Sequence, residues 1–207
     1  MSGVAVLLLG IGLGLRHASD ADHVVVVSAL VQREPGAWRA ARIAALWGMG
    51  HSAAFLGVGL LIVMGQFRAT AAFETVAELL VAAMLIGLGI WHLIRRPAPA
   101  DRTEPAISSA RPLLIGLVHG IAGSAGIALL AATTIASPAL AAAYLLLFAL
   151  GTVLGMVTLT VLMSRPIGWT ARRGPRWGRG LTMLSAVLSL SLGLAVIVQT
   201  LWGGGVT

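Results

Sequence analysis

Long apolar runs dominate the sequence, and they constrain its fold more than any other feature. There are six of them, over residues 4–31, 40–65, 72–94, 113–132, 139–163 and 180–202. About 20 apolar residues are enough for a helix to cross the hydrocarbon core of a bilayer. A segment in lipid must satisfy its own backbone hydrogen bonds, so each run is expected to be an α-helix. The sequence therefore predicts an all-α, polytopic membrane protein with six transmembrane helices.

The composition agrees with a membrane protein. Hydrophobic residues make up 58% of the 207 residues and charged residues only 10%, whereas a typical soluble domain has about 25% charged residues. The chain has no cysteine, which excludes disulfides and thiolate metal sites. Any metal ligands must therefore be imidazole, carboxylate, hydroxyl or backbone groups.

The arginines predict the topology. All 14 basic residues are arginines, and 12 of them follow the first, third and fifth apolar runs. The positive-inside rule places those connections in the cytoplasm, so we expect a multi-pass protein of the inner (cytoplasmic) membrane with both termini outside. Four tryptophans near the predicted cytoplasmic ends are expected to anchor them at the interface: Trp38, Trp91, Trp169 and Trp177. The net charge of +7 thus indicates membrane topology and a lipid partner, with no nucleic acid partner.

The chain reads as a single transporter domain made of two halves. The stretch 97–112 is polar and rich in proline, which is typical of a linker. It separates a first half, about 1–96, from a second half, 113–207, and each half contains three apolar runs.

The two halves resemble each other weakly. The sequence GLRH at 14–17 resembles GLVH at 116–119, and an alignment of the second runs places Gly50 opposite Gly151. Because each half has an odd number of spans, the two halves must enter the membrane in opposite senses. This pattern predicts the 3+3 inverted repeat of secondary transporters, with a substrate site near the midplane.

The first apolar run carries five ionisable residues near its middle: Arg16, His17, Asp20, Asp22 and His23. A fixed charge at the centre of a spanning helix costs roughly 2.5–3.5 kcal/mol, and each apolar neighbour returns only about 0.3–0.6 kcal/mol. The run therefore needs internal pairing, neighbouring helices or a bound ion. Ionisable residues within a membrane are functional candidates by default.

Three of these residues form the pattern H-x4-D-H. On a regular helix Asp22 lies about 140° and His23 about 240° around the axis from His17. Either each side chain faces a different helix, or the backbone unwinds locally and gathers them around one ion, as broken helices do in transporters. Arg16 and Asp20 are four residues apart and are expected to form an ion pair on the helix.

Another histidine, His51, lies in the second run and is followed by Ser52. Together with His17, Asp22 and His23 it makes a set of three imidazoles and one carboxylate. Imidazole suits nickel, copper, zinc and iron, whereas magnesium and calcium prefer oxygen ligands. We therefore predict a transition-metal site formed by these four residues.

Three other residues are secondary candidates for a metal or its pathway. His119 takes the place of His17 in the second half and is either a second-step ligand or a hydrogen-bonded packing residue. Asp20 lies between His17 and Asp22 in the sequence, and Ser52 follows His51. His92 lies near the predicted cytoplasmic end of the third run, where an interfacial role is expected.

These motifs resemble the nickel/cobalt transporter family, which lies within the wider NicO group. The family signature is H-x4-D-H within R-H-A-x-D-A-D-H, and residues 16–23 read RHASDADH. The following helix of the family carries Gly-His-Ser or Gly-His-Thr, which is matched at 50–52. The chain looks most like the short six-helix members grouped with urease-accessory permeases.

The resemblance implies transport of Ni2+ or Co2+, with His17, Asp22, His23 and His51 as metal-handling residues. It implies no cofactor beyond the transported ion. Related efflux proteins often carry a histidine-rich loop, and its absence here favours uptake.

Two other functions compete with this interpretation. H-x4-D also resembles an acyltransferase motif, in which a histidine acts as general base and an aspartate orients it; His17 would then pair with Asp22. A LysE-type exporter of a metal or small molecule shares the six-helix plan, but a metal-free exporter would not need three such groups in one span. We expect a transporter and not an enzyme, and metal dependence separates the alternatives.

Overall fold

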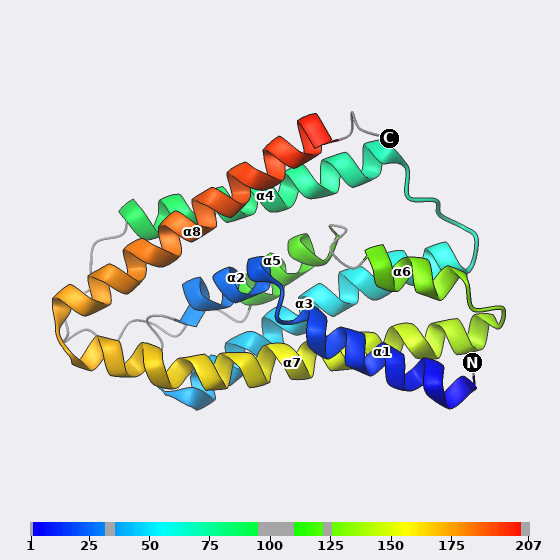
Figure 1. The fold of residues 1–207 in the computed structure, drawn as a ribbon, viewed down its shortest axis with the longest axis horizontal. Helices are drawn as coiled ribbons and strands as arrows, with labels where there is room; N and C mark the ends of the chain where they lie inside the picture. Colours follow the sequence, from blue (N-terminus) through cyan, green and yellow to red (C-terminus); the bar gives the residue numbers. More distant parts are fainter. Residues whose placement is uncertain (1, 32–35, 95–109, 122–125, 204–207) are drawn as a thin grey trace.

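A computed structural model describes residues 2–31, 36–94, 110–121 and 126–203, which form helices and short connections without a strand (Figure 1). The predicted all-α class is confirmed for these residues. The helices are α1 (Gly3–His17), α2 (Ala21–Val31), α3 (Ala37–Val63), α4 (Ala71–Ile94), α5 (Ala110–Ile121), α6 (Gly126–Thr133), α7 (Pro138–Arg172) and α8 (Pro175–Trp202).

The described residues contain fewer candidate spans than the predicted six. Four helices, α3, α4, α7 and α8, are long and apolar enough to cross a membrane, and α1 with α2 makes a fifth span bent by 56°. The predicted run 113–132 is instead divided between the short helices α5 and α6, and residues 122–125 between them lie outside the described part. The protein is therefore an integral membrane protein, with four or five candidate spans among the described residues.

The connection expected over 164–179 is mostly helical. Helix α7 continues to Arg172, because a helix that leaves the membrane can carry charged residues in water. A sharp turn then follows at Gly174, whose φ of 126° favours glycine. The guanidinium of Arg173 lies over the ring of Trp169, 3.6 Å from its centroid.

The two halves of the chain are interleaved. Helix α1 packs along α7, α3 packs along both α5 and α7, and α4 packs along α8. Both termini lie at the end of the long axis opposite the turn between α7 and α8 (Figure 1). Helices α1 and α5 both end near the middle of that axis (Figure 1). His17 and His119, which lie at these two ends, are both buried.

Glycines allow the closest helix contacts. A Cβ atom at Gly14 of α1 would collide with the carbonyl of Phe148 in α7, and one at Gly116 of α5 would collide with the carbonyl of Trp47 in α3. Small residues let membrane helices approach in this way. A side chain at either glycine would push its helix away from its neighbour.

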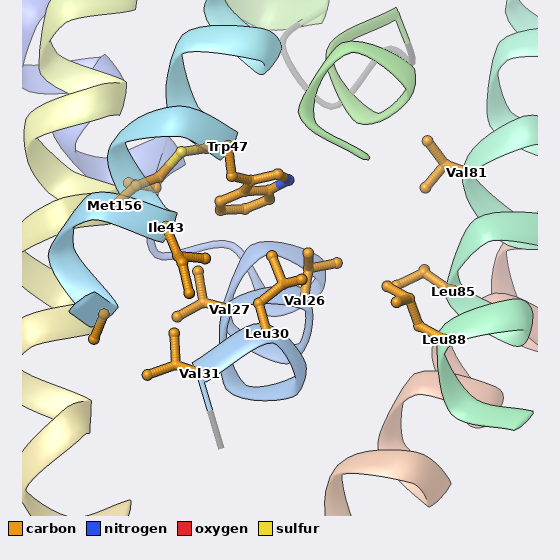
Figure 2. Packing of buried hydrophobic residues seen from close by; sticks show 12 residues of the cluster. Val26, Val27, Leu30, Val31, Ile43, Trp47, Val81, Leu85, Leu88 and Met156 are labelled. Atoms are coloured by element: carbon orange, nitrogen blue, oxygen red, sulfur yellow. The ribbon is translucent and has the colours of Figure 1, made fainter. Parts of the chain in front are cut away.

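Helix α2 is embedded among α3, α4, α7 and α8. Figure 2 shows Val26 and Leu30 of α2 between Trp47 of α3 on one side and Leu85 and Leu88 of α4 on the other. Because lipid tails are as apolar as these side chains, the gain comes mainly from close packing. This packing fixes the position of α2 and therefore of the polar residues in its first turn.

His92 joins α4 to the end of α2. Its Nδ1 lies 2.8 Å from the carbonyl oxygen of Leu88 and its Nε2 lies 3.0 Å from that of Ala29. The residue is half-buried. His92 therefore makes an interhelical contact, and its place at the membrane interface stays a prediction.

Candidate metal centre

A break between α1 and α2 brings the H-x4-D-H residues together. Helix α1 ends at His17, and α2 begins at Ala21. The backbone N–H of Asp20 donates to the carbonyl of His17 at 3.0 Å and closes a tight turn. Of the two arrangements that the pattern allowed, the structure has the local unwinding, which groups His17, Asp22 and His23 in one place.

Four histidines from four helices meet at this break, and we call them the histidine cluster: His17, His23, His51 and His119. Each is at most 5% exposed. The ring centroid of His23 lies 4.5 Å from that of His17, 5.0 Å from that of His51 and 4.7 Å from that of His119. His23 is therefore the central member, next to the three others.

His17, His23 and His51 form one group that could hold a metal ion, with one ligand atom from each within 4.8 Å of the others. The Nε2 atoms of His17 and His51 are 3.3 Å apart. His23 Nε2 is buried and has no hydrogen-bond partner among the described residues. A metal ion bound here would accept a lone pair from an imidazole nitrogen such as His23 Nε2, for which the described residues provide no hydrogen-bond partner.

Asp22, His23 and His119 form a second group, again with one ligand atom from each within 4.8 Å of the others. One oxygen of Asp22, Oδ1, accepts from the backbone N–H of His23 and lies 2.9 Å from His23 Nδ1. The other oxygen, Oδ2, lies 3.0 Å from His119 Nε2. His119, for which the sequence left two roles open, thus lies within the histidine cluster and makes a hydrogen bond to Asp22.

Asp20 contacts His17 instead of Arg16. Its Oδ2 lies 2.8 Å from His17 Nδ1, and the Arg16 side chain is exposed. The expected ion pair between Arg16 and Asp20 is not formed in the described chain, because the break at the end of α1 takes Asp20 out of the helical register. A carboxylate on Nδ1 orients the ring and leaves Nε2 directed at His51.

Two neighbours of the cluster have other roles. The Ser52 hydroxyl donates to the carbonyl of Ala149 at 3.2 Å, so Ser52 joins α3 to α7. Trp47, which the sequence analysis did not single out, places its buried ring 5.4 Å from that of His23 and 5.8 Å from that of His119. Its position four residues before His51, on the same helix face, was the available signal.

Asp20→Ala is expected to weaken Ni2+ binding by roughly 10–100-fold, the usual cost of removing a carboxylate that orients a metal-binding histidine. Asp20→Asn should cost less, because an amide oxygen can still accept from His17 Nδ1. The exposed neighbour Ser19 provides a control, since Ser19→Ala alters the same turn without removing a contact to His17. Isothermal titration of the purified protein with NiCl2 measures the effect, and equal affinities for Asp20→Ala and Ser19→Ala would contradict the expectation.

Comparison with known proteins identifies the family. The urease accessory protein UreH of Bacillus sp. (strain TB-90) is 30% identical over 184 residues, which are 82% of this chain and 81% of that protein. The chain belongs to the UreH family. No family model and no solved structure matches it.

Two plant proteins are also similar to this UreH-family chain. The chloroplast proteins FOR GROWTH AND FERTILITY 2 and 1 of Arabidopsis thaliana are 28% and 26% identical over 206 and 211 residues. Each alignment covers 91% of this chain but only 55% and 57% of the plant proteins. The motifs at 16–23 and 50–52 indicated a resemblance to members grouped with urease-accessory permeases, and the similarity to a urease accessory protein agrees with it.

Proposed function

We propose that this protein transports a divalent transition-metal ion, Ni2+ or Co2+, across a membrane. The observation that carries the proposal is the buried group of His17, His23 and His51, whose ligand atoms lie within 4.8 Å of one another at a break in a spanning helix. Nitrogen ligands of this kind suit such metals. The relation to a urease accessory protein favours nickel, in line with the urease-accessory permeases that the signature resembles.

Each residue of the site has its own role in the proposed transport. His17, His23 and His51 bind the ion through imidazole nitrogens, and the Asp22 carboxylate lies next to His23 and His119. Asp20 orients His17. The apolar packing around α2 excludes bulk water, which strengthens the attraction between the carboxylate and a cation.

Reciprocal contacts support an inverted repeat. Gly14 of α1 meets α7 at Phe148, and Gly116 of α5, its partner in the aligned GLRH and GLVH motifs, meets α3 at Trp47. In each contact a glycine of one half meets a backbone carbonyl of the other half, and the two contacts are related by exchanging the halves. A twofold axis between the halves produces such an arrangement.

Helices α4 and α8 repeat this relation. Gly89 of α4 meets Leu190 of α8, and Gly193 of α8 meets Ile86 of α4. The repeat supports alternating access to a site near the midplane, where α1 and α5 end.

The direction proposed is uptake. The end that carries the turn between α7 and α8, with Arg173 stacked on Trp169, faces the cytoplasm under the positive-inside rule, and both termini face outside. An inside-negative potential favours cation entry by about 2.3 kcal/mol per charge for each 100 mV.

The acyltransferase alternative requires His17 and Asp22 to act as a pair. In the structure His17 Nδ1 faces Asp20, while Asp22 contacts His23 and His119. These contacts support metal handling and leave the general base without its expected orienting aspartate.

Metal accumulation in cells tests the proposal. Cells that express the wild type should contain more Ni2+ or Co2+ than cells that express a His17→Ala/His23→Ala double variant. The His92→Ala variant, which loses a half-buried histidine outside the cluster, should behave like the wild type. Lower metal content with the wild type, relieved in the double variant, would reverse the direction to export. Equal metal content in all correctly inserted variants would contradict metal transport.

A further inference from the structure

His23 belongs to both groups of ligands, and its two ring nitrogens face different surroundings. Nδ1 lies 2.9 Å from Asp22 Oδ1, whereas Nε2 is buried without a hydrogen-bond partner among the described residues. The two nitrogens project in different directions in the plane of the ring, so His23 can offer a different ring position to each group. The His23 ring centroid lies 4.7 Å from that of His119 in the second group, and 4.5 and 5.0 Å from those of His17 and His51 in the first.

The two groups also draw on different helices. The first group comes from α1, α2 and α3, all in the first half of the chain. The second group combines Asp22 and His23 of α2 with His119 of α5, which belongs to the second half. His119 is completely buried, and its Nδ1 has no hydrogen-bond partner among the described residues.

We propose that the histidine cluster holds one metal ion at a time in two alternative positions. The first position is formed by His17, His23 and His51, and the second by Asp22, His23 and His119. His119 is thus a metal ligand of a second position that completes the transport path. This inference rests on the proposed function and extends it from one site to two.

The two positions exclude each other. A neutral imidazole offers one lone pair, so His23 cannot bind two ions at once without losing its remaining proton. Two divalent cations on either side of a single buried ring would also repel each other strongly at low dielectric. An ion therefore passes from one position to the other by exchanging its ligands around His23.

The helix contacts indicate which helix movement would transfer the ion between the two positions. A Cβ atom at Gly120 of α5 would collide with the backbone of His51, so α5 and α3 touch directly and hold His119 and His51 in a constant relation. His17, in contrast, stands on α1, which touches α7 at Gly14. A shift of α1 relative to α3 would remove His17 from the first position, and the second position contains no residue of α1.

Ni2+ binding by the purified full-length chain tests the two positions, with His51→Ala removing a ligand of the first and His119→Ala a ligand of the second. We expect one ion per chain in the wild type and in each single variant, and at least a 100-fold weaker affinity in the double variant. X-ray absorption should show three imidazole ligands in His119→Ala, and two imidazoles with a carboxylate in His51→Ala. Nickel flux into proteoliposomes should fall at least tenfold in both single variants.

A variant of His119 that keeps its hydrogen bond to Asp22 distinguishes the loss of a metal ligand from the loss of that hydrogen bond. His119→Gln retains an N–H donor for Asp22 but no imidazole, so its flux should also fall while its thermal stability stays near that of the wild type. Wild-type flux in His119→Gln, or two ions bound at once in the wild type, would overturn the two-position proposal while leaving metal transport intact. A wild type that binds no Ni2+ or Co2+ would overturn both proposals.

Discussion

The His23→Ala variant is expected to lose its bound metal almost completely. His23 is the one residue common to both ligand groups, and its ring centroid lies within 5.0 Å of those of the three other histidines of the cluster. Removing even an outer partner of a metal ligand costs roughly 10–100-fold in affinity. Loss of the shared ligand should therefore lower the affinity by more than 100-fold, beyond the effect of either His51→Ala or His119→Ala.

The measurement is the metal content of the purified protein after equilibration with NiCl2 and removal of free ion, determined by mass spectrometry. His92→Ala is the matched control, because it removes an imidazole that bonds to backbone carbonyls and stands apart from the cluster. The control should retain the wild-type stoichiometry. Full metal content in His23→Ala would show that the ion binds elsewhere and would contradict the proposed site.

The candidate site was largely predictable because polar groups are expensive in a membrane. His17, Asp22 and His23 stand in one apolar run, and that alone marked them as candidate functional residues. His51 was recognised by the same reasoning, strengthened by its Gly-His-Ser context. The structure places all four side chains together, although their spacing on an unbroken helix would have separated them.

The position of the helix break could not be derived from the sequence. Apolar periodicity describes a segment as a whole and does not show where tertiary contacts replace lost backbone hydrogen bonds. The expected pair of Arg16 and Asp20 was wrong for this reason, since it assumed a continuous helix. The same limit explains why the run 113–132 was expected to be a single span and contains α5 and α6.

Helix ends beyond the membrane were missed for a different reason. The arginine-rich stretch after Met163 was interpreted as a loop, yet α7 continues to Arg172. Charge alone does not distinguish a loop in water from a helix that projects into water, because arginine is a good helix former. The positive-inside rule is unaffected, since it depends on the side of the membrane and not on secondary structure.

The Gly116→Ala variant is expected to separate α5 from α3 and to weaken both folding and metal binding. The added Cβ would collide with the carbonyl of Trp47. A backbone carbonyl cannot rotate away from this contact as a flexible side chain could. Overpacking of this kind costs about 1–3 kcal/mol. A shift of α5 would also move His119, which follows Gly116 by less than one helical turn, away from Asp22.

Gly57→Ala is the matched control, because a Cβ at Gly57 meets nothing within 4 Å. In a helix the alanine is favoured by roughly 0.5–1 kcal/mol, so this variant should melt at or above the wild-type temperature. Gly116→Ala should melt lower, by roughly 2–4 °C for each kcal/mol lost in a chain of this size. Thermal unfolding in detergent followed by circular dichroism measures the difference, and nickel titration of the same samples measures the effect on the site. Equal melting temperatures and equal nickel affinities for the two variants would show that the contact between α5 and α3 does not position His119.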